Sequence, residues 1–120
     1  MHNYKELNIW KRAIKLAVEA YEISASLPAD ERYGLTSQIK RAAVSIASNI
    51  AEGAGRNTDG EFVQFLGIAN GSSFELTTQL MIAIELGLIK EDKAILLLNE
   101  SDELQKMLYT LMNNISNKKR

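Results

Sequence analysis

The chain has 120 residues, of which 46% are hydrophobic and 24% charged, with a formal net charge of −1. This composition is typical of a single globular domain and excludes a largely disordered chain or an overtly basic, nucleic-acid-coating protein. With no cysteine and a single histidine, His2, the chain has no disulfide framework, thiolate zinc site or histidine-based triad. We therefore expect no cofactor and no metal.

The first long segment has the apolar spacing of an amphipathic helix, and we place a helix at residues 6–26. Leu27 and Pro28 end it, because the residue before a proline is biased away from helical backbone. Its inward stripe is expected to be Trp10, Ile14, Ala17, Val18 and Tyr21.

The second segment predicts a helix at residues 35–52 that is rich in alanine, so that a neighbouring helix can approach closely. Gly53 and Gly55 are expected to end it, because glycine accepts a left-handed C-cap. The inward residues are expected to be Leu35, Ile39, Ala42, Ala43, Ile46 and Ile50.

Two longer helices are predicted at residues 59–86 and 91–115. Thr58 and Glu61 form a capping-box pattern at the start of the first, and Gly87 follows its end. Residues 116–120 are expected to be a disordered tail. Because the connections are short, the four helices should run up, down, up and down in one antiparallel four-helix bundle spanning residues 1–120.

The helix at residues 59–86 carries more apolar surface than one bundle requires. It has no lysine or arginine and no charge at all between Phe62 and Phe74. A second apolar face predicts contact with another subunit. The expected interface residues are Val63, Gly67, Gly71, Phe74 and Met81. Alternatively, the two glycines accommodate a helix of the same chain.

Polar residues among the alanines of the second helix form a stripe that can face the third helix. The stripe and its expected partners are Ser45, Asn49, Glu52, Ser72 and Glu75. Two carboxylates can perform acid–base chemistry, but there is no histidine to pair with them. We interpret the set as a structural hydrogen-bond network in a protein that is not an enzyme.

Basic residues are concentrated in the first half of the chain and could contact phosphate if a ring of subunits repeated them. The candidates are Lys11, Arg12, Lys15, Lys40, Arg41 and Arg56. The alternative is a solvated charged surface. The aromatic residues Trp10, Tyr21, Phe62 and Phe65 are expected in the core.

Several runs resemble a known bacterial family. They are Gly34–Ile46, Asn49–Gly53 with Arg56, Phe62, Phe65-Leu66, Ile68-Ala69, Gly71-Ser72 and Glu75-Leu76, with Leu7, Trp10, Ala13 and Tyr21 fitting the opening. The chain is similar to four-helix-bundle proteins known as 23S rRNA intervening-sequence or ribosomal-protein-like proteins. This family is related to the accessory variability proteins of diversity-generating retroelements.

The resemblance implies a homopentameric barrel without enzymatic activity. The related retroelement proteins bind nucleic acid and a reverse transcriptase. We therefore predict a non-catalytic accessory factor associated with RNA or a nucleoprotein, with a protein-binding scaffold that makes no nucleic-acid contact as the alternative. No segment has the character of a signal peptide or membrane span, so a cytoplasmic location without membrane contact is expected.

Overall fold

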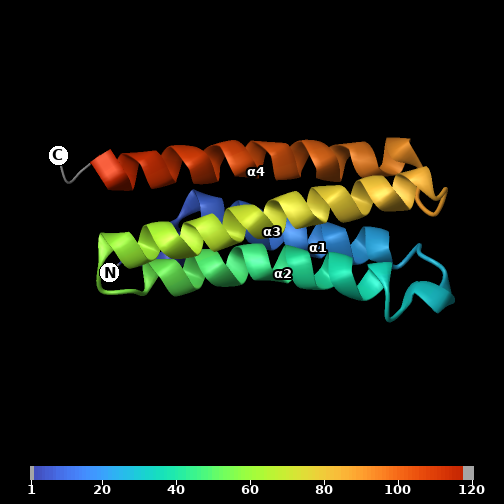
Figure 1. Cartoon of the computed structure of the whole chain (residues 1–120), viewed down its shortest axis with the longest axis horizontal. Helices are drawn as coiled ribbons and strands as arrows, with labels where there is room; N and C mark the ends of the chain where they lie inside the picture. The colour runs from blue at the N-terminus through green and yellow to red at the C-terminus, as the bar shows by residue number, and fades with distance from the viewer. Residues whose placement is uncertain (1, 118–120) are drawn as a thin grey trace.

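The computed structural model describes residues 2–117, and all regular structure in this part of the chain is helical. The α-helices are α1 (Asn8–Ser24), α2 (Leu35–Ala54), α3 (Asp59–Glu85) and α4 (Glu91–Asn117), with 3₁₀ turns at Tyr4–Glu6 and Ala29–Glu31. Consecutive helices run in opposite directions along a bundle of 49 × 21 × 20 Å (Figure 1). The all-α prediction is confirmed.

Each helix packs against two others: α1 against α2, α2 against α3, α3 against α4, and α4 against α1. The pairs α1–α3 and α2–α4 lie on the diagonals. The contact between α2 and α3 is the most extensive and that between α1 and α4 the least. The α1–α4 boundary is therefore the most open side of the bundle.

The helix boundaries differ from the predicted ones by about one turn at most. Helix α1 begins only at Asn8, because Leu7 has extended backbone with ψ of 122°. Helix α4 continues to Asn117, so the first two residues of the predicted tail are helical. The remainder of that tail, residues 118–120, lies outside the described residues.

Both ends of α3 have the predicted local chemistry. Thr58 caps the start, where its Oγ1 accepts a hydrogen bond from the backbone N–H of Glu61 at 3.2 Å. At the other end Gly87 has a φ of +72°, which favours glycine. The N–H groups of Gly87 and Leu88 then donate to the carbonyls of Ile84 and Ala83, both at 2.9 Å. This Schellman arrangement satisfies the free carbonyls of the last turn.

Gly53 was predicted to end α2, but the helix continues through it to Ala54. Gly53 is buried, and a Cβ built there would lie 2.7 Å from Phe65 Cβ and 3.0 Å from a ring carbon of Phe62. Gly55 is the C-cap, but its φ of −83° is right-handed. Gly53 is thus required for close helix packing, not for a turn.

The predicted inward stripe of the first helix is wrong at three of its five residues, since only Trp10 and Ala17 pack against the core. Ile14, Val18 and Tyr21 are 40, 53 and 46% exposed, whereas the buried residues of α1 are Ile9, Ala13, Leu16, Ala20 and Ser24. Both stripes have helical spacing, and the large residues of one obscured the alanines of the other. The stripes of α2 and α3 were largely correct, with Phe62 buried and Phe65 partly buried.

Candidate functional surfaces

A small hydrogen-bond network joins α2 to α3. The hydroxyls of Ser45 and Ser72 are 2.8 Å apart, and Asn49 Nδ2 donates to both the Oγ and the carbonyl oxygen of Ser45 at 2.9 and 2.8 Å. These are three of the five residues predicted to form a network. Glu52 and Glu75 are exposed and form no hydrogen bond with this trio.

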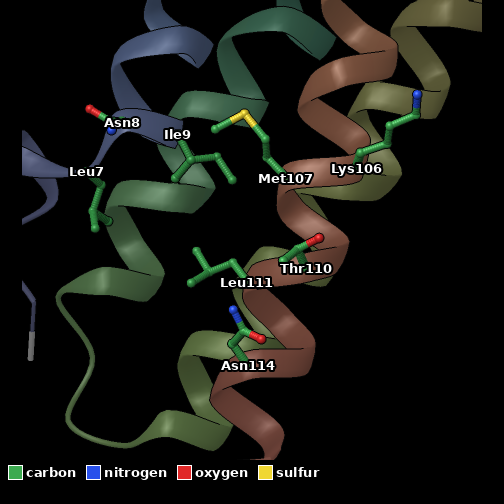
Figure 2. A pocket seen from close by; sticks show the side chains of 8 residues that line it. All are labelled: Leu7, Asn8, Ile9, Lys106, Met107, Thr110, Leu111 and Asn114. Carbon is green, nitrogen blue, oxygen red and sulfur yellow. The ribbon is translucent and has the colours of Figure 1, made fainter.

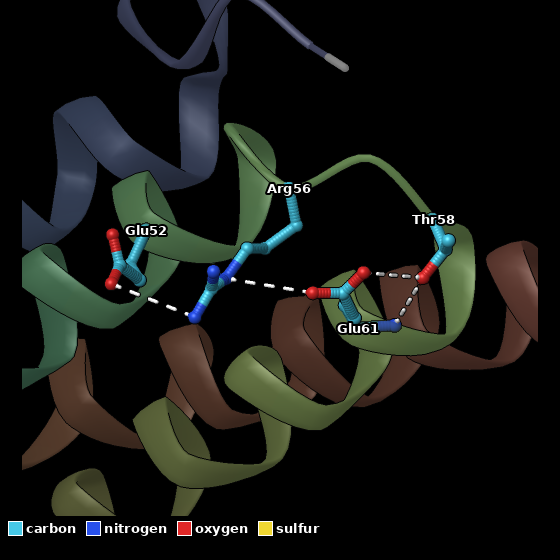
Figure 3. A network of polar contacts seen from close by, with 4 residues as sticks. All are labelled: Glu52, Arg56, Thr58 and Glu61. Carbon is cyan, nitrogen blue, oxygen red and sulfur yellow. Dashed lines mark hydrogen bonds and ion pairs between the residues drawn. The ribbon is translucent and has the colours of Figure 1, made fainter.

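Glu52 belongs instead to a polar cluster at the α2–α3 turn (Figure 3). Arg56 lies 4.0 Å from Glu52 and 3.7 Å from Glu61, and Thr58 Oγ1 donates to Glu61 at 3.0 Å. The Arg56 guanidinium also covers the ring of Phe65, with 4.8 Å to the ring centroid. Arg56, a predicted nucleic-acid contact, is therefore engaged in holding the turn.

A second polar network, which was not predicted from the sequence, joins α3 to α4. Ser101 is fully buried; its Oγ lies 3.1 Å from Thr77 Oγ1 and donates to the carbonyl oxygen of Ser73 at 3.4 Å. Gln105 Nε2 also donates to Thr77 Oγ1 at 3.4 Å. The four-residue spacing of Ser73 with Thr77, and of Ser101 with Gln105, is the sequence signal that was available.

The basic residues differ in how strongly they are held within the chain. Arg12 is 2.8 Å from Glu100 and also donates to the sulfur of Met107, so it joins α1 to α4. Lys40 lies over the ring of Tyr21, with 4.9 Å to the centroid. The remaining predicted contacts, Lys11, Lys15 and Arg41, form no ion pair within residues 2–117.

A polar cleft of about 350 Å³ lies between α2 and α3. Its lining includes the predicted residues Arg41, Ser45, Ser72 and Glu75, and it adds Gln38 and Gln79, which were not predicted. Arg41 and Glu75 share the cleft without forming an ion pair with each other. The side-chain oxygen of Gln79 is buried and has no hydrogen-bond partner.

An apolar cavity of about 400 Å³ lies at the open α1–α4 boundary. Ile9 and Met107 face each other across it and Leu111 points into it, whereas Lys106 points away (Figure 2). Leu7 lines the side formed by the start of α1. The cavity offers contact surface with no charged group directed into it.

The outer face of α3 is the apolar surface predicted as an interface. Phe74 and Met81 are 55 and 44% exposed, and a Cβ built at Gly67 or Gly71 would meet nothing within 4 Å. The two glycines are therefore not required by packing within the described chain. Val63 differs from the others, because it is partly buried against the core.

Within residues 2–117, no group of three or more His, Asp or Glu residues is arranged to hold a metal ion. None of the helices in this range is both long and apolar enough to cross a membrane.

The fold and these surfaces define a four-helix bundle with polar helix–helix contacts and exposed apolar faces. The chain belongs to the 23S rRNA-intervening sequence protein family, whose model matches residues 5–110. No curated protein matches the chain. Its fold is similar to the crystal structure of a protein of unknown function from the S23 ribosomal protein family of Bacteroides thetaiotaomicron VPI-5482. That match has a TM-score of 0.80 and 24% identity, and it covers 87% of this chain and 97% of the other.

Proposed function

We propose that this protein is a non-catalytic, self-assembling accessory factor that associates with RNA or a nucleoprotein in the cytoplasm. The observation that carries self-assembly is the pair of exposed glycines, Gly67 and Gly71, beside exposed Phe74. Glycine in a helix interior is about 1 kcal/mol less favourable than alanine. Glycines that packing inside the chain does not require are explained by close approach of another subunit's backbone.

The partner surface we propose is the apolar ridge of α1, formed by Ile14, Val18 and Tyr21 with Val44 of α2. Since α1 and α3 are diagonal in the bundle, this ridge and the outer face of α3 point in different directions. Contact between two unlike faces is heterologous, and such contacts close into a ring when the rotation permits. The resemblance to pentameric relatives supports five subunits.

The assembly is tested by light scattering of the Phe74→Glu variant, with circular dichroism as a check on folding. A buried carboxylate at the contact is unfavourable, so we expect a mass of one subunit with helicity retained. Leu96→Glu is the matched control: Leu96 is 73% exposed on α4, which contributes to neither proposed face, and this variant should remain assembled. An unchanged mass for Phe74→Glu would refute the proposed interface.

The support for RNA association is the family's name and the placement of Lys40 and Arg41 on α2. Neither side chain forms an ion pair within the described chain. A ring repeats this pair in every subunit, so that a chain of near-zero net charge presents local positive sites. Arg12 and Arg56 contribute less in this proposal, because both are held by carboxylates.

The RNA proposal is tested by binding of nuclease-treated protein to structured 23S rRNA fragments across a salt series. We expect affinity to fall with salt, and the log–log slope to decrease by about 1 when Lys40→Glu removes one phosphate contact. The control is Lys106→Glu, which reverses an exposed charge on α4 that pairs with Asp102. Absence of binding at low salt would refute RNA association.

The second candidate, a protein-binding scaffold, is favoured by the apolar cavity between α1 and α4. Leu111 points into this cavity and is only partly buried, so an apolar side chain of a partner can pack against it. This candidate predicts that Leu111→Asp abolishes recruitment of the protein partner while Lys40→Glu has no effect. The opposite pattern would favour RNA.

A further inference from the structure

We propose that the polar cleft between α2 and α3 binds an unpaired guanine base. This inference rests on the proposed RNA association and assigns it a specific recognition site. The cleft lies on the α2–α3 side of the bundle and has a volume of about 350 Å³, within the range of small-ligand pockets. Arg41 and Ser45 of the cleft also border Tyr21 and Val44 of the proposed ridge, whereas Gln38, Glu75 and Gln79 belong to neither proposed assembly face.

The first observation is an unsatisfied acceptor. The Gln79 side-chain oxygen is buried without a hydrogen-bond partner, although nearly all buried polar atoms in proteins have one. Gln79 lines the cleft beside Glu75, which is another pure acceptor when ionised. This side of the cleft therefore offers two acceptors to a ligand that presents hydrogen-bond donors.

The second observation is an unpaired cation in the same cleft. Arg41 is exposed, offers donors only, and forms no ion pair with any described residue. Arg41 and Glu75 could neutralise each other, but they remain separate. The complementary ligand has an acceptor pair for Arg41 and a donor pair for Glu75 and Gln79.

Among the four bases, guanine has this arrangement. Its O6 and N7 are two adjacent acceptors, which an arginine contacts in the commonest specific base contact. Its N1–H and 2-amino group are donors on the Watson–Crick edge, where Glu75 and Gln79 can accept them. Adenine presents a donor beside N7, and uracil presents one donor between two acceptors. Cytosine has adjacent acceptors at O2 and N3 but only one donor group, its 4-amino group. Bases are accessible on both edges only when unpaired, so the target is a single-stranded or looped nucleotide.

The closest competing ligand is a free amino acid, whose carboxylate and ammonium would also satisfy Arg41 and Glu75. The RNA family name and the neighbouring Lys40 favour the base, because a nucleotide's phosphate continues from the cleft onto this basic surface. Glycine, like any amino acid with an uncharged side chain, has no second anionic group that would pair with Lys40. Amino-acid binding is therefore a refuting outcome of the test.

The test is calorimetric titration of the assembled protein with GMP, AMP and glycine. We expect GMP to bind at least about tenfold more tightly than AMP. IMP, which lacks the 2-amino donor, and 7-deaza-GMP, which lacks the N7 acceptor, should each bind more weakly than GMP.

The decisive variant is Glu75→Gln. The matched control is Glu85→Gln, which changes another exposed glutamate of α3. Removing a negative charge should strengthen binding of any anionic nucleotide if the cleft acts by charge alone. If Glu75 contacts guanine, the same change should weaken GMP binding by about tenfold and abolish the preference over AMP. Glu85→Gln should retain the preference, since Glu85 does not line the cleft.

The outcomes separate this site from the proposed function. Salt-dependent rRNA binding with no preference for GMP refutes the guanine site and leaves RNA association standing. A GMP preference lost in Glu75→Gln, without rRNA binding at low salt, supports the site and refutes RNA association. Glycine binding that Glu75→Gln abolishes, without GMP binding, identifies an amino-acid site and overturns the proposal.

Discussion

Replacing Gly67 and Gly71 together with alanine should affect the single subunit and its assembly in opposite directions. A Cβ at either position meets nothing within 4 Å, so neither methyl group strains the chain. Each substitution removes about 1 kcal/mol of helix penalty, and the pair should stabilise the isolated subunit by about 2 kcal/mol. With an unfolding entropy of about 0.25 kcal/mol/K for a chain of this size, Tm should rise by about 8 °C.

In the assembly, the same methyl groups would occupy the surface where another backbone approaches. We expect the subunit dissociation constant to rise at least about tenfold, or about 1.4 kcal/mol per contact. A more stable subunit combined with a weaker assembly cannot result from a general stabilisation of the fold.

The effect on subunit stability and the effect on assembly are measured separately, in chains with and without the Phe74→Glu substitution. Thermal unfolding is measured in Phe74→Glu chains, which are expected to be monomeric, because the Tm of an oligomer depends on concentration. Sedimentation velocity over a dilution series then measures assembly of chains with native Phe74. Unchanged assembly of the double-alanine variant would refute the close approach of another subunit at these glycines. A lower Tm in the monomeric background would refute the claim that the positions are unconstrained.

Three further substitutions test the packing. Gly53→Ala should destabilise the chain by about 1 to 3 kcal/mol in urea denaturation, because its Cβ would overlap Phe65; a neutral result would contradict the tight α2–α3 contact. Thr58→Ala should lower stability by about 1 kcal/mol through loss of the α3 cap, and an unchanged Tm would show that the cap contributes little. Ser72→Ala should lower stability by about 1 kcal/mol because it removes the partner of Ser45, whereas a gain in stability would show that the network is not stabilising.

Local sequence patterns, such as capping residues and helical spacing, predicted much of the fold. The capping pattern at Thr58 and the glycine at position 87 placed both ends of α3 within a residue. Serine and asparagine at helical spacing on α2 correctly predicted contact with Ser72. These features depend on residues close in sequence, or on one helix face against its neighbour.

Other sites were not predictable from the same patterns. Glu52 and Asn49 lie on one side of α2, but Arg56 beyond the end of the helix holds Glu52 at the turn. Gln79 could not be recognised from the sequence, because glutamine is common on helices. Only the structure shows that its side-chain oxygen is buried without a hydrogen-bond partner. Arg12 was indistinguishable from its basic neighbours until α4 placed Glu100 beside it.

The sequence by itself determined the number of helices, their approximate ends and the excess of apolar surface on α3, because these follow from periodicity, capping and composition. Only the tertiary structure decided which of the two apolar stripes of α1 is buried. It also showed that Gly53 is needed for packing while Gly67 and Gly71 are not. The physical reason is that burial depends on neighbouring helices, so identical residue types with identical spacing take different roles according to what packs against them.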